Sequence, residues 1–71
     1  MNLYQLWAGE KLWSSRDSAY VVANNPEDAK NCMTSGSDSL WVSVSSCMDC
    51  GPYTQEIPKD CYQSCGAYLI S

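Results

Sequence analysis

Four of the five cysteines in this 71-residue chain form two closely spaced pairs. Two residues separate Cys47 from Cys50, three separate Cys61 from Cys65, and a glycine follows the second cysteine of each pair. Structural zinc sites bind the metal with four thiolates in a tetrahedron, and ligand pairs with spacers of this length are typical of them. The glycines permit a positive φ, which lets backbone N–H groups point at the sulfurs. The pattern therefore predicts a structural Zn²⁺ held by Cys47, Cys50, Cys61 and Cys65.

Disulfides and free thiols are the alternatives to zinc for these cysteines. The segment 1–7 has no basic start, and the longest apolar run, 19–23, is too short to cross a bilayer. We therefore expect a cytoplasmic protein without membrane contact, in a reducing compartment where disulfides are rare. An odd number of cysteines also fits a closed disulfide framework poorly. Cys32 is expected to be a buried thiol, although it could replace one of the four ligands.

The length allows one domain, residues 1–71, with a small hydrophobic core. A chain of this size buries only about 60% of the surface that its unfolded form exposes, so a metal or a partner commonly supplements the core. Residues 1–45 carry the regular patterns, whereas 46–65 carry four cysteines and little periodicity. We expect the zinc to hold this cysteine-rich loop, and residues 66–71 to add a strand.

Strands are predicted at 3–7, 19–23, 40–44 and 67–70, where aromatic and β-branched residues concentrate. In the third of these, Trp41 should face away from Leu40 and Val42. A turn is expected at 8–10, a polar loop at 14–18, and a break at 34–38.

A short helix should begin after Asn25, because Asn25 can cap the free N–H groups and Pro26 suits the first helical position. It should end near Cys32 or Met33, with Ala29 and one of Cys32 and Met33 turned inward. The prediction is an α+β fold with a β-β-α-β core: a three- to four-stranded sheet, one short helix and a cysteine-rich zinc-binding loop.

The first half resembles a group of small phage and prophage proteins of uncharacterised function. The residues that carry this resemblance are the opening Met1-Asn2-Leu3-Tyr4, then residues 17–23 (DSAYVVA) and 26–29 (PEDA). The cysteine-rich segment departs from that pattern. The resemblance implies an origin, and a host cytosol as the location, but it implies no functional residues.

Charge and composition narrow the function classes. The net charge is −4, and only four Lys and Arg residues are present, so direct contact with nucleic acid is disfavoured. The chain has no histidine, which removes the commonest general base and the usual catalytic zinc sites, and we do not expect an enzyme. Two alternatives stay open: a nucleic-acid-binding zinc module, and a thiol oxidoreductase that uses Cys47 and Cys50.

Three tryptophans and five tyrosines point instead to binding of another protein, because these side chains combine apolar area with a polar tip. Core packing is the alternative for each of them. Four are predicted to be partly exposed and to bind a partner: Trp7, Trp13, Tyr53 and Tyr62. We therefore expect a small acidic phage-type protein that binds a host protein with a basic surface and modulates it; in the sharper form it inhibits a defence or replication factor. A homodimer is also plausible.

Overall fold

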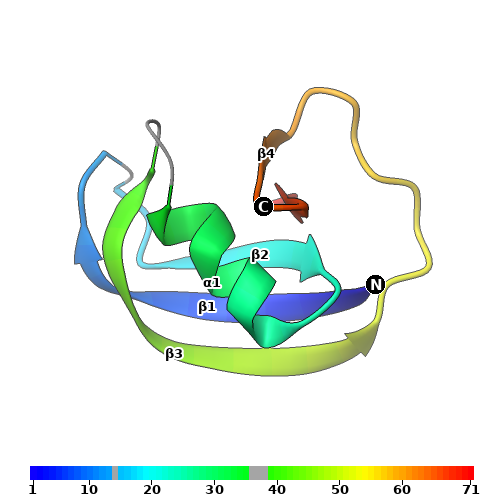
Figure 1. Cartoon of the computed structure of the whole chain (residues 1–71), viewed down its shortest axis with the longest axis horizontal. Helices are drawn as coiled ribbons and strands as arrows, with labels where there is room; N and C mark the ends of the chain where they lie inside the picture. The colour runs from blue at the N-terminus through cyan, green and yellow to red at the C-terminus, as the bar shows by residue number, and fades with distance from the viewer. Residues whose placement is uncertain (14, 36–38) are drawn as a thin grey trace.

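The protein folds as a five-stranded antiparallel sheet with one helix packed on one face (Figure 1). The structure is a computed structural model that describes residues 1–13, 15–35 and 39–71. The elements follow the order β1 (Asn2–Lys11), β2 (Ser18–Ala23), α1 (Pro26–Thr34), β3 (Trp41–Pro52), β4 (Tyr62–Ser64) and β5 (Ala67–Leu69). The α+β class with a single short helix is confirmed, but the sheet has five strands rather than three or four.

The strand order is β3-β1-β2-β5-β4, and each neighbouring pair is antiparallel. Because β2 and β3 both run antiparallel to β1, they run parallel to each other with β1 inserted between them. Helix α1 joins β2 to β3 and crosses in front of β1 (Figure 1). Strands β3 and β4 form the two opposite edges of the sheet, which is the arrangement that decides where the cysteines lie.

The core lies between α1 and the sheet face that it covers. Tyr4 and Leu6 of β1 stand opposite Val21 and Ala19 of β2, so all four side chains point to this face. They meet three buried residues of α1, namely Ala29, Cys32 and Met33. Each large buried side chain contributes about 1.5–3 kcal/mol through burial. The sequence pattern predicted that Ala29 and one of Cys32 and Met33 face inward; in the structure all three are buried.

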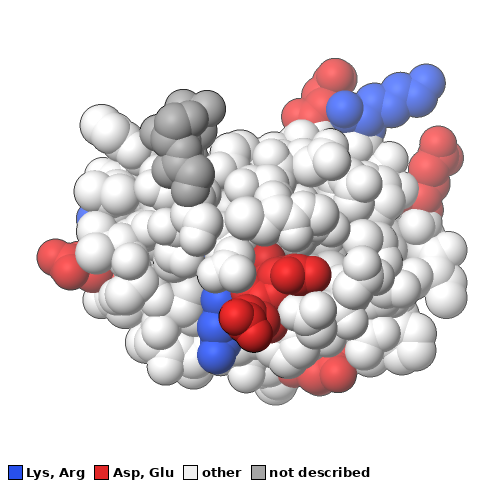
Figure 2. All heavy atoms as spheres, in the orientation of Figure 1, with Lys and Arg blue, Asp and Glu red and all other residues white. Residues whose placement is uncertain are grey.

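The helix begins and ends as its sequence indicates. The backbone N–H of Asp28 donates to Asn25 Oδ1 at 2.8 Å, so Asn25 caps the first turn, and Pro26 follows it as expected. At the other end the backbone N–H of Ser35 donates to the Asn31 carbonyl at 2.8 Å. Acidic side chains gather over the start of α1, and a basic side chain lies beside them (Figure 2).

Strands β1 and β3 pair as a two-stranded ribbon, and the predicted end of each of these strands was wrong. The turn expected at 8–10 is absent, because β1 continues through Gly9 to Lys11. Strand β3 continues through Cys47 and Cys50 to Pro52, so the segment 46–65 is not one loop. The predicted alternation at Trp41 holds for Val42 only: Trp41 is fully buried and Val42 is 47% exposed, but Leu40 packs against the same core as Trp41.

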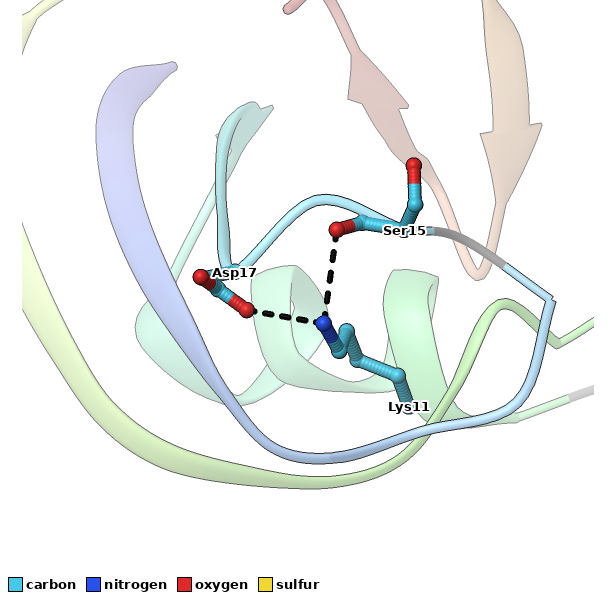
Figure 3. A network of polar contacts seen from close by, with 3 residues as sticks. All are labelled: Lys11, Ser15 and Asp17. Atoms are coloured by element: carbon cyan, nitrogen blue, oxygen red, sulfur yellow. Dashed lines mark hydrogen bonds and ion pairs between the residues drawn. The ribbon is translucent and has the colours of Figure 1, made fainter.

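The connection from β1 to β2 is closed by one small polar network. Lys11 Nζ donates to Asp17 Oδ1 at 2.9 Å and to the Ser15 carbonyl oxygen at 3.3 Å (Figure 3). Both ionic side chains are well exposed, so the pair contributes at most about 1 kcal/mol. Ser14 and residues 36–38, which belong to the predicted polar loop and the predicted helix break, lie outside the described residues.

Candidate functional site: the cysteines and the exposed apolar residues

The structure places the two cysteine pairs at opposite edges of the sheet. Cys47 and Cys50 lie in β3, whereas Cys61 directly precedes β4 and Cys65 lies between β4 and β5. All five cysteines are described, and each is a free thiol. Within residues 1–13, 15–35 and 39–71, no three Cys, Asp or Glu side chains are grouped so that they could hold a metal ion. The four predicted ligands are therefore not brought together, and zinc binding stays a prediction.

Each of the two glycines that strengthened the zinc prediction has a role in the strands. Ser64 pairs with Ala67, so Cys65 and Gly66 form the whole two-residue loop of the β4–β5 hairpin. Their φ angles are 53° and 75°, as a hairpin loop with two left-handed residues requires. Glycine suits the second position, but a cysteine at the first position is unusual.

Gly51 lies at an irregularity of the β1–β3 ladder. The pairing shifts between Asn2 and Tyr4, where Asp49 pairs with Tyr4 and Pro52 pairs with Asn2. Gly51 has a φ of 97°, and its N–H donates to Asp49 Oδ1 at 2.8 Å. A β-bulge of this kind commonly needs a residue with positive φ. The repeated Cys-Gly pattern thus corresponds to one hairpin and one bulge.

Cys47 is half-buried and points to the helix side of the sheet, since it stands opposite Leu6 and packs against the core. Burial raises the pKa of its thiol, and the positive charge of Lys30 opposes this effect. A reactive redox cysteine needs the reverse shift and a helix N-terminus beside it. Cys47 lies in a strand, so the arrangement lacks both features of the thiol oxidoreductase alternative.

Cys32 belongs to the core, as the sequence indicated. Its side chain is fully buried on α1, and its Sγ lies 3.7 Å from the Ala67 carbonyl oxygen. Burial raises the pKa of this thiol to about 11. The thiols of Cys65 and Cys61 act on this pKa in the same direction. Cys61 also lines a pocket of about 330 Å³.

The four aromatic residues predicted to bind a partner do not form one surface. Trp13 follows the end of β1 and is 77% exposed. Tyr53 lies at the other end of β1, where its N–H donates to the Met1 carbonyl, so the ten residues of β1 lie between Trp13 and Tyr53. Trp7 is half-buried in the middle of β1, and Tyr62 is half-buried against the core.

Trp13 has an exposed apolar neighbour that the sequence analysis did not select. Leu12 is 51% exposed, and the backbone N–H groups of Leu12 and Trp13 both donate to the Leu40 carbonyl at 3.1 Å. We call Leu12 and Trp13 the ribbon-end patch. The signal in the sequence was the adjacent Leu12-Trp13 pair.

Comparison with known proteins assigns no family to this chain. In the part of the chain that is described, no helix is both long and apolar enough to cross a bilayer. No family model, no curated protein and no solved structure matches this chain.

Proposed function

We propose that this chain is a small acidic accessory protein, of the kind that phages encode, which binds a host protein and modulates it. In the sharper form of the proposal it inhibits a defence factor. The single observation that carries the binding part is the exposure of Trp13. Tryptophan is strongly enriched among the interface residues that dominate binding energy. The Trp13 side chain is 77% exposed, so it contributes little to the hydrophobic core.

The backbone that presents Trp13 is held in place. Two hydrogen bonds to the Leu40 carbonyl fix Leu12 and Trp13 against the start of β3. Binding of a partner to this segment would therefore cost less conformational entropy than binding to a flexible tail that must first become ordered. The ribbon-end patch therefore has the features of a preorganised contact surface. The net charge of −4 favours a partner with a basic surface.

The test is retention of a bacterial protein on the immobilised full chain, compared with two variants. Trp13→Ser removes the exposed indole, and Tyr20→Ser removes a less exposed aromatic side chain from the middle of the sheet as a matched control. We expect one protein to be retained by the native chain and by Tyr20→Ser, and lost with Trp13→Ser. Circular dichroism of each variant checks that it is folded. Retention that is indifferent to Trp13→Ser would overturn the proposal.

A further inference from the structure

The sheet has a second face, which α1 does not cover. Residues that pair across neighbouring strands point to the same face, and successive residues of one strand point to opposite faces. Because Tyr4 and Val21 pair and belong to the core under α1, the residues next to them point away from the helix. We call this second side the open face, and its paired residues are Leu3, Gln5, Trp7, Ser18, Tyr20, Val22, Ser46, Met48, Gln63 and Tyr68.

The open face is apolar where a sheet face in contact with water is normally polar. An antiparallel sheet with one solvated face usually alternates between apolar residues inside and polar residues outside. Six of the ten residues of the open face are apolar or aromatic, so this sheet does not follow that alternation. Tyr20 is 37% exposed and Met48 is 48% exposed. A contiguous apolar surface of this kind commonly marks a contact with another macromolecule.

The charge of the open face distinguishes between the kinds of partner, because none of its ten residues is charged. Sheet faces that bind single-stranded nucleic acid combine aromatic stacking with basic side chains, which these ten residues do not supply. A basic protein surface would lose the hydration of its charges here without gaining a carboxylate. A second copy of the chain brings only neutral residues to the contact. The acidic side chains over the start of α1 lie on the other side of the sheet (Figure 2).

The open face is also large enough for a stable contact between two chains. The molecule measures 30 × 23 × 18 Å, and Figure 1 looks down the shortest axis with α1 in front of the sheet, so the open face is one of the two broad sides. One broad side of such a body has about a fifth of the accessible surface of 4238 Å², or about 850 Å². A standard interface buries about 800 Å² on each partner.

We infer that two copies of this chain pack face to face through their open faces. The contact is isologous, with the same ten residues on both sides of a two-fold axis. Sheets that stack in this way lie about 10 Å apart and interdigitate their side chains. Met48, Tyr20 and Trp7 become buried in the contact, while the two helices lie on the outside. This inference does not rest on the proposed function, and it concerns a different surface from the ribbon-end patch.

Sedimentation equilibrium of the full chain tests the inference. At about 100 μM the native chain should have twice the chain mass of 7.9 kDa. Met48→Lys and Glu27→Gln each make the net charge less negative by one, but only Met48→Lys places a charge on the open face. Met48→Lys should raise the dissociation constant at least about tenfold, whereas Glu27→Gln should leave it unchanged. Met48 is already half exposed, so the variant should fold, and circular dichroism checks this.

Amide resonances of the ¹⁵N-labelled chain locate the contact. On dilution the resonances of the open face should shift, whereas those of α1 should not. A native chain that is monomeric at about 100 μM would overturn the inference, and so would a dimer that is indifferent to Met48→Lys or shifts that map to α1. A monomeric chain whose open face shifts only on addition of the retained host protein would assign this face to that partner instead.

The two proposals fail separately. Trp13→Ser should lose the host protein and keep the dimer, whereas Tyr20→Ser should keep the host protein and weaken the dimer. If the chain dimerises through the open face and no host protein is retained through Trp13, only the proposed function fails. If a host protein is retained through Trp13 by a monomeric chain, only the inference about the open face fails.

Discussion

Gly9 of β1 lies directly against Ser43 of β3, where a Cβ added to Gly9 would come within 2.6 Å of Ser43 Oγ and 3.3 Å of the Ser45 backbone nitrogen. The same region contains register shifts between Ala8 and Glu10. Glycine is therefore required here by the close approach of two strands, not by a turn.

The Gly9→Ala variant should lower the free energy of unfolding by about 1 kcal/mol. The added methyl group is overpacked between the strands, and this strain exceeds the stabilisation gained because alanine is less flexible than glycine in the unfolded chain. Urea denaturation followed by circular dichroism measures this. Ser43→Ala alone should change stability by less than about 0.5 kcal/mol, since Ser43 is exposed. In the double variant the cost of Gly9→Ala should fall. Strictly additive costs would show that Ser43 Oγ does not limit the space at Gly9.

Cys65→Asn should stabilise the protein by about 0.5–1 kcal/mol. Asparagine tolerates the left-handed conformation that Cys65 adopts at the first position of the hairpin loop, whereas cysteine is strained there. Cys50→Asn is the matched control, because Cys50 is also exposed but has an ordinary negative φ, and it should give no gain. If both substitutions instead destabilise the protein strongly, both thiols have a role, such as metal binding, that the sheet alone does not explain.

The helix and the inner strands could be predicted from the sequence because their signals are local. The Asn25-Pro26 start and the inward positions of α1 follow from capping and from helical periodicity. The position of β2 follows from its β-branched residues. These features need no knowledge of the rest of the chain.

The continuation of β3 beyond residue 44 and the edge strand β4 could not be predicted, because they depend on pairing between distant residues. Strand β3 has a low apolar content beyond Val44, and it is a strand there because β1 pairs with it from Trp7 to Asn2. The glycines beside Cys50 and Cys65 have positive φ, which zinc knuckles, bulges and hairpins all use. Sequence spacing therefore could not separate a metal site from two strand irregularities on opposite edges.

Asn25→Ala should cost about 1 kcal/mol of stability, because it leaves the N–H of Asp28 without its 2.8 Å acceptor. Asn24→Ala is the control, since Asn24 is exposed and precedes the cap. It should change stability by less than about 0.5 kcal/mol. Thermal or urea denaturation compares the two variants. Equal effects would mean that the cap does not contribute to the helix as the geometry indicates.

The spacing of the cysteines predicts a zinc site, whereas the observed strand order places the two cysteine pairs at opposite edges of the sheet. The metal content of the purified protein tests which of the two is right. The sheet and the core place the two cysteine pairs apart, so we expect protein treated with EDTA to keep its circular dichroism spectrum. Elemental analysis of protein purified without chelator, together with thiol titration, measures the zinc content directly. One zinc per chain, with unfolding when the zinc is removed, would bear out the structural zinc that the cysteine spacing predicts.

The stability of the protein should fall as the pH rises from about 9 to about 11, because of Cys32. Its thiol has an ordinary pKa of 9.0 in the unfolded chain and about 11 in the folded protein, where burial disfavours the thiolate. Below pH 9 both states hold the proton, so the group adds no pH dependence. Above pH 9 the unfolded chain loses the proton first, which favours unfolding by up to about 2 kcal/mol near pH 11.

Cys32→Ala removes this titration and leaves the remaining cysteines, tyrosines and lysines in place. The variant should be less stable at neutral pH, because it opens a small cavity, but its stability should decline less steeply between pH 9 and 10.5. The difference between the two slopes, measured by urea denaturation, isolates Cys32 from the other groups that titrate in this range. Parallel slopes would show that the Cys32 thiol is not shielded from ionisation by the core formed by α1 and the sheet.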